Sequence, residues 1–335
     1  MWQRRRKRAK ASLNATCLLP QAAYGVNSQG ELITIEEVTS GKTNLVCPFC
    51  GCEASRRHRD LTAKKGKIKQ HHFAHTGETC LRVRKGKLPS LPLYDNFHLQ
   101  LSAKHFQLLK DLWREYGHTN YAIITVPFEL EMKKACAPAH RLASQGESAK
   151  PIDWTLQGYF FTDLGKIPVG GLSLSKFNNI QEPLILSELN RLNNSVEMAK
   201  AIGGELLQEK LDDLKIYQLQ LQRILRFTLY FLQIQADNKI LHKIGVTSRT
   251  MSDRLPEIER DLKQHYSDIN IDVLGTWQHR GNVELYFKHR YKQFNHRISK
   301  LTEYYSFKDV DAVLKDLNSM QPKVLKKVEL EILQI

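Results

Sequence analysis

The longest regular pattern of apolar positions lies just past the middle of the chain, over residues 182–225. Its members recur near heptad spacing and are Leu186, Leu189, Val196, Leu206, Leu211, Leu214 and Leu221. The spacing predicts a long helical tract, which Gly203-Gly204 interrupts. Two arrangements fit the pattern. We favour a helical hairpin packed within its own domain over a coiled coil between molecules.

Shorter patterns predict elements before this tract. Phe97, Leu101, Leu108 and Leu112 indicate an amphipathic helix within residues 93–116. Runs rich in β-branched residues predict short strands at 32–38, 43–47, near His72, 121–128 and 156–161.

After the tract, the pattern predicts a β-hairpin that begins at Phe227, followed by helices. Ala236-Asp237-Asn238-Lys239 supplies the turn, Gly245 ends the second strand, and residues 248–254 lead into a helix. A later helix over 281–296 carries an apolar stripe, made of Val283, Phe287, Tyr291 and Phe294.

These elements predict an α+β fold, and 335 residues are too many for one small core. We expect several domains. In chain order they are a basic arm (1–15), a small zinc-binding module (16–90), a mixed α/β middle domain (91–181), a helical connector (182–225) and a small sheet flanked by helices (226–335).

Charge indicates the class of partner. The formal net charge is +15, which favours a polyanion, with nucleic acid ahead of an anionic membrane surface. No apolar run reaches the roughly 18 residues of a membrane span, and no apolar stretch follows the basic start as in a signal peptide. We therefore expect a cytoplasmic protein that is not inserted in a membrane. The pattern specifies no oligomeric state.

Cysteines and histidines cluster in the N-terminal region. Four of the six cysteines lie between Cys47 and Cys80, and Cys47-Pro48-Phe49-Cys50 is a C-x-x-C knuckle. With the later His72, His75 and Cys80, this spacing predicts a structural Zn²⁺ site. The two histidines compete for one place, and we favour His75.

Other assignments of the cluster remain open. Cys52 lies beside the knuckle, and we interpret it as a bystander. The alternative to a metal site is a set of scattered thiols and surface histidines.

The order C-P-F-C, then H-H-F-A-H, then C is similar to the N-terminal zinc element of CoiA-like competence proteins, over residues 20–85. The resemblance implies that a restriction-endonuclease-like domain follows, with Glu129 and Asp153 as candidates for two of its acidic positions. No E-x-K occurs in residues 168–173 where the family has one. We therefore expect that domain to be degenerate and to act as a scaffold.

A second constellation lies in the C-terminal region. Tyr230 and Lys243 fall on the two strands of the predicted hairpin, Arg254 on the next helix and Glu284 on a later one. Residues 226–310 resemble the GIY-YIG nuclease superfamily. Thr228-Leu229-Tyr230 stands for its first motif and Lys243-Ile244-Gly245 for its second, with lysine in place of the second tyrosine. The closing Glu303-Tyr304-Tyr305 resembles the E-W-F end of the phage-type branch.

The residue types suit metal-assisted hydrolysis of a phosphodiester. Tyr230, with Lys243 stabilising its phenolate, would act as general base. Arg254 would stabilise charge on the phosphoryl oxygens, and Glu284 would hold one Mg²⁺ or Mn²⁺. His242 and His289 are weaker candidates.

The leading interpretation is a DNA endonuclease. The alternatives are a nucleic-acid-binding protein that does not cut and an enzyme that acts on RNA.

Overall fold

We describe the fold from a computed structural model. The residues it describes are 24–50, 60–64, 72–75, 89–97, 101, 103–117, 122–123, 158–159, 161 and 163–334. They form a mixed α+β fold, as predicted, in two compact units, Met1–Pro89 and Ser90–Ile335. The basic arm at residues 1–15 lies outside the described residues, and the finer division into five domains stays a prediction.

The first unit contains a five-stranded antiparallel sheet. Its strands are β1 (Tyr24–Val26), β2 (Leu32–Thr34), β3 (Gly41–Val46), β4 (Asp60–Lys64) and β5 (His72–His75), in the order β2-β1-β3-β4-β5. The predicted strands at 43–47 and near His72 are confirmed. The strand predicted at 32–38 stops at Thr34, because the one-turn 3₁₀ helix η1 (Ile35–Glu37) follows.

The second unit begins with short elements that correct two predictions. Helix α2 (Ala103–Tyr116) starts ten residues later than the predicted 93–116, because residues 91–97 form turns and Leu93 has a positive φ of 53°. The predicted strands at 121–128 and 156–161 are described only as β6 (Ala122–Ile123) and β7 (Gly158–Tyr159), which pair with each other. Glu129 and Asp153 lie outside the described residues.

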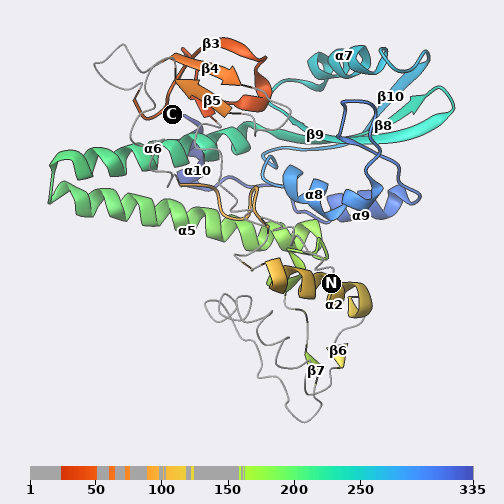
Figure 1. Ribbon diagram of the computed structural model, residues 1–335, viewed down its shortest axis with the longest axis horizontal. Coiled ribbons are helices and arrows are strands. Elements are labelled where there is room, and N and C mark those ends of the chain that lie inside the picture. The colour runs from red at the N-terminus through yellow and green to blue at the C-terminus, as the bar shows by residue number, and fades with distance from the viewer. Residues whose placement is uncertain are drawn as a thin grey trace, which may run out of the picture. The chain divides into compact units, whose positions relative to one another are not determined.

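A helical hairpin follows a single turn of helix, α4 (Asp163–Lys166). It consists of α5 (Leu174–Lys200) and α6 (Gly204–Arg226), which lie side by side in Figure 1. Leu189 of α5 and Leu221 of α6 are buried in one cluster, which also includes Ile332 of the C-terminal helix α10 (Lys327–Leu333). The hairpin predicted over 182–225 is confirmed, although α5 begins earlier, at the Ser173 cap.

A four-stranded antiparallel sheet forms the rest of the second unit. Its strands are β8 (Thr228–Ala236), β9 (Lys239–Thr247), β10 (Ile269–Trp277) and β11 (Tyr304–Tyr305), in the order β10-β8-β9-β11. The predicted turn between β8 and β9 is confirmed, and Asp237 adopts the left-handed φ of 51° that a tight turn uses. Two cross-strand pairs matter below: Tyr230 with Gly245 and Leu232 with Lys243.

Helices cover both faces of this sheet (Figure 1). Helix α7 (Met251–Leu262) lies on one face, and α8 (Glu284–Arg290) and α9 (Val310–Asn318) lie on the other. Side chains of β8 therefore alternate between two cores: Tyr230 and Leu232 pack toward α7, while Leu229 and Phe231 pack toward α8. The helix predicted over 281–296 is shorter than expected, because it ends at Arg290 and a 3₁₀ turn η3 (Lys292–Phe294) follows.

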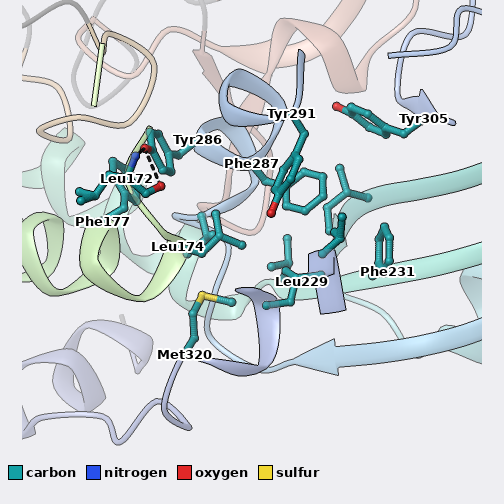
Figure 2. Close-up of a cluster of buried hydrophobic side chains, with 14 of the residues drawn as sticks. Leu172, Leu174, Phe177, Leu229, Phe231, Tyr286, Phe287, Tyr291, Tyr305 and Met320 are labelled. Atoms are coloured by element: carbon teal, nitrogen blue, oxygen red, sulfur yellow. Dashed lines mark hydrogen bonds between the residues drawn. The ribbon is translucent and has the colours of Figure 1, made fainter. Parts of the chain in front are cut away.

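The core on the α8 face joins the sheet to the helical hairpin (Figure 2). The rings of Phe177 in α5 and Tyr286 in α8 stack with centroids 3.8 Å apart. The Tyr286 hydroxyl donates to the Leu172 carbonyl at 3.0 Å and accepts from the Leu172 amide at 3.2 Å. Sheet and hairpin therefore share one hydrophobic core. Among the described residues, no helix combines the length and the apolar character that crossing a membrane requires.

Candidate active site and metal centre

The Cys/His cluster of the first unit brings three ligand atoms together. The Sγ atoms of Cys47 and Cys50 and a ring nitrogen of His75 all lie within 4.8 Å of one another, and Cys50 Sγ is 3.5 Å from His75 Nε2. Both cysteines follow the end of β3, and His75 ends β5, two strands away in the same sheet. This Cys₂His group could bind a metal ion.

The strand geometry places His75 on the side of the small core. Side chains of a strand alternate between faces, so His75 shares a face with Phe73. Phe73 is buried in the same small core as Cys47. His75 is thus grouped with the two cysteines, and the side chain of His72 lies outside what the structure describes. Cys80 and Cys52 lie outside the described residues.

In the second unit, Tyr230 lies on the α7 face of the sheet, directly over Gly245. Its side chain is almost completely buried, with 1% exposure. A Cβ atom added to Gly245 would lie 2.4 Å from the Tyr230 hydroxyl oxygen. The glycine of the second motif therefore makes room for the tyrosine of the first.

Arg254 lies on α7 beside Tyr230, close enough for the tyrosine to raise the pKa of the guanidinium. The Thr250 side chain caps the start of α7 by accepting from the Asp253 amide, which places Arg254 in the first turns of the helix. Burial alone would lower the pKa of Arg254, but Tyr230 and Glu257 together raise it. The guanidinium is therefore a permanent cation at the edge of the Tyr230 site.

Lys243 lies on the same face of β9 as Gly245, two residues earlier. Its side chain is 6% exposed, and Nζ donates to Glu303 Oε2 at 2.9 Å. Nζ also lies 4.8 Å from the centre of the Tyr304 ring. The ammonium group is thus held by a carboxylate and an aromatic ring next to the Tyr230 site.

Glu284 comes from the other face of the sheet. It is the first residue of α8, its side chain is 12% exposed, and its Oε1 lies 3.0 Å from Lys288 Nζ. Lys288 also donates to Glu303 Oε1 at 2.5 Å. Glu303 lies just before the edge strand β11, so it joins Lys288 on one face to Lys243 on the other.

Lys243, Glu303, Lys288 and Glu284 form a row in which positive and negative groups alternate. These charges shift the pKa values of Glu303 and Lys288. Burial raises the pKa of Glu303, but Lys243 and Lys288 outweigh it and hold the pKa at about 2. Burial likewise lowers the pKa of Lys288, and Glu284 and Glu303 outweigh it and raise that pKa. Glu303 and Lys288 are therefore both charged at neutral pH.

The structure thus brings three of the four predicted residues together directly and the fourth only through other side chains. Tyr230, Lys243 and Arg254 share the α7 face of the sheet, whereas Glu284 reaches them only through Lys288 and Glu303 at the β11 edge. Neither Lys288 nor Glu303 was predicted from the sequence to take part in the site. The spacing of four between Glu284 and Lys288, which places both on one side of a helix, was a signal available for Lys288.

The two weaker candidates, His289 and His242, lie in other parts of the fold. His289 Nε2 lies 3.1 and 2.9 Å from the carbonyl oxygens of Ile167 and Pro168. His242 is buried beside Phe231 on the α8 face, and neither ring nitrogen has a hydrogen-bond partner. Neither histidine faces the Tyr230 site.

No known protein family, curated protein or solved structure matches the chain.

Proposed function

We propose that this protein is a metal-dependent DNA endonuclease that hydrolyses phosphodiester bonds at the Tyr230–Lys243–Arg254–Glu284 site. The observation that carries the proposal is the convergence of Tyr230, Lys243 and Arg254 on one sheet face, with Gly245 making room for the tyrosine ring. The resemblance to the GIY-YIG superfamily names the same residues in the same order. The net charge of +15 supports a polyanionic substrate.

Each residue has a role that suits its surroundings. Arg254 carries a permanent charge and binds the phosphoryl oxygens, where negative charge grows during attack. Tyr230 acts as general base toward the attacking water, with the Arg254 cation beside its side chain. Lys243 adds a second cation on the same face, held in place by Glu303.

Glu284 would hold the catalytic Mg²⁺ or Mn²⁺. A carboxylate is the ligand that these ions prefer, and they retain several water molecules, so a single protein carboxylate is sufficient. The ion, when bound, supplies positive charge beside the phosphate and lowers the pKa of a bound water. Glu303 lies on the other side of Lys288 and keeps that lysine oriented toward Glu284.

The Cys47–Cys50–His75 group would hold Zn²⁺, with Cys80 as the proposed fourth ligand. Four protein ligands close the coordination sphere, so this ion would stabilise the module and take no part in catalysis. The resemblance to the zinc element of CoiA-like proteins supports this assignment. We assign the module and the basic arm to nucleic-acid binding.

Plasmid cleavage with added Mg²⁺ tests the proposal. Wild-type protein is expected to nick or linearise the plasmid, while Glu284→Gln and Arg254→Ala lose at least about a hundredfold in rate. Glu259→Gln is the matched control, because Glu259 lies on the exposed side of α7 and, among the described residues, forms an ion pair with Lys263 alone, at 2.7 Å. A wild-type protein that cuts neither plasmid, single-stranded DNA nor RNA would refute the enzyme assignment.

A second function, nucleic-acid binding without cleavage, is favoured by two observations. Tyr230 is 1% exposed, and Glu284 already pairs with Lys288. Under this alternative the residues only stabilise the fold. Wild-type protein would then bind DNA, cut none, and bind it with unchanged affinity after Glu284→Gln.

A further inference from the structure

Two arginines share one carboxylate on the outer side of α7. Arg249 donates from Nη1 to Glu257 Oε1 at 2.7 Å and from Nη2 to Oε2 at 2.8 Å. Arg254 donates from Nη1 to the same Oε2 at 2.5 Å. The side chains of Arg249 and Glu257 are 52% and 35% exposed, so the group lies at the surface.

The geometry of this group suits a phosphate. The Glu257 carboxylate accepts two hydrogen bonds from one guanidinium and a third from another. Its two oxygens therefore occupy positions that the two non-bridging oxygens of a phosphodiester could take. Tyr230 lies beside Arg254, and the buried Nε of Arg254 has no hydrogen-bond partner among the described residues. The Arg254 guanidinium is therefore already in place, whereas the Arg249 guanidinium can adjust at the surface.

The turn that leads into α7 sets the position of Arg249. Its amide donates to the Thr247 hydroxyl at 3.0 Å, at the end of β9, and Thr250 next to it caps the helix. Arg249 and Glu257 are eight residues apart, so their contact is no ordinary pair between neighbouring helix turns. The turn brings Arg249 beside the catalytic face of the sheet.

We propose that Arg249 and Arg254 form a clamp for a backbone phosphate of the nucleic acid, and that Glu257 occupies this clamp until the phosphate displaces it. The inference rests on the proposed function for Arg254 and adds Arg249 as a second phosphate ligand. Glu257 then acts as an internal competitor that weakens binding to any polyanion. Exchange is feasible, because exposed ion pairs are weak individually.

Binding of a short, fluorescein-labelled DNA duplex, followed by anisotropy without added Mg²⁺ or Mn²⁺, tests the clamp without cleavage. Glu257→Gln is expected to bind roughly threefold to tenfold more tightly than wild type, since two ion pairs no longer compete. Glu259→Gln makes the same charge change on the same helix and is the control. Arg249→Gln is expected to weaken binding and to reduce the slope of log K against log salt by about 1.

The double variant Arg249→Gln with Glu257→Gln separates competition from general charge. If Glu257 acts by holding Arg249, its substitution brings a smaller gain once Arg249 is gone. Equal gains for Glu257→Gln and Glu259→Gln, an unchanged salt slope for Arg249→Gln, or no DNA binding by wild type would each overturn the clamp.

The outcome is independent of catalysis. Without added Mg²⁺ or Mn²⁺, a protein that never cuts DNA still reports the clamp, so failure of the proposed endonuclease and failure of the clamp are told apart. Thermal unfolding of each variant verifies the fold, which the exposed positions of Arg249 and Glu257 leave intact. If the protein cleaves DNA and Glu257→Gln leaves the DNA affinity unchanged, the endonuclease proposal stands and the clamp proposal is refuted.

Discussion

At the scale of single residues, the contact between Tyr230 and Gly245 explains why the second strand of the site carries a glycine. Its Cβ would lie 2.4 Å from the tyrosine hydroxyl and 2.6 Å from the ring carbon that bears it. Both residues belong to central strands of a sheet, so neither backbone moves easily. The sequence motif named this glycine, but only the cross-strand register shows what it accommodates.

This contact predicts the effect of Gly245→Ala. The added methyl group overpacks a buried site, so we expect a loss of about 1–3 kcal/mol in the free energy of unfolding. Urea denaturation followed by circular dichroism measures this. We also expect cleavage to fall more than stability alone explains, because the tyrosine hydroxyl is displaced from Arg254. A variant as stable as wild type would mean that the ring lies elsewhere.

His242 predicts a pH dependence of stability. Burial, partly opposed by the Tyr305 backbone, lowers its pKa from the ordinary value, so the folded protein disfavours the charged ring. The unfolded chain binds a proton as pH falls through about 6.5, and the folded chain does so only at lower pH. The stability contributed by the neutral ring is therefore present above that pH and is lost as the pH falls below it.

The experiment compares wild type with His242→Phe by urea unfolding between about pH 7.5 and pH 5. Phenylalanine keeps the ring beside Phe231 and Phe307 and removes the titrating nitrogens. We expect the variant to lose less stability than wild type over this range. Equal losses would show that other groups cause the acid sensitivity.

At the scale of elements, the helical hairpin fixes the segment that carries Glu284. Arg280 donates to Glu182 of α5 at 2.6 Å and to the Gln321 carbonyl. Asn282 donates to Asn178 at 2.9 Å and to Gln181 at 3.0 Å, both in α5. The bonds to α5 link residues about a hundred positions apart, so no local pattern in the sequence predicts them.

These bonds make Asn282 a test of how the hairpin positions the candidate metal ligand. Asn282→Ala leaves the buried amides of Asn178 and Gln181 without their partner and is expected to cost about 1–3 kcal/mol. If the segment also positions Glu284, the Mg²⁺ concentration for half-maximal cleavage rises. Ser195→Ala, on the exposed side of α5, is the control. A loss of stability with an unchanged Mg²⁺ dependence would make Asn282 purely structural.

At the scale of the whole molecule, local patterns predicted the elements better than their assembly. The hairpin β8–β9 and the helices α5 and α6 follow from turn residues and periodicity within short windows. The strands β1 and β4 have three and five residues and too little alternation to be recognised. The network that joins Glu284, Lys288, Glu303 and Lys243 depends on the edge strand β11 pairing with β9, a contact sixty residues apart in sequence.

The division into two units leads to a prediction about metal removal. Among the described residues of the first unit, one buried cluster consists of Ile35, Leu45, Cys47, Ala63 and Phe73. Cys47 belongs to this cluster, so a metal held by Cys47, Cys50 and His75 would tie the cluster together and stabilise the unit. Removing the metal is therefore expected to unfold residues 1–89 and to leave residues 90–335 folded.

Metal analysis and limited proteolysis test this. We expect about one zinc per chain in wild type, and loss of most of it in Cys47→Ser and His75→Ala. A strong chelator should expose the first unit to protease while the second unit survives as a fragment. Cys136→Ser, outside the cluster, should keep its zinc. His72→Ala separates the two histidines: zinc retained there and lost in His75→Ala would support His75 as the ligand, and the reverse result would refute it.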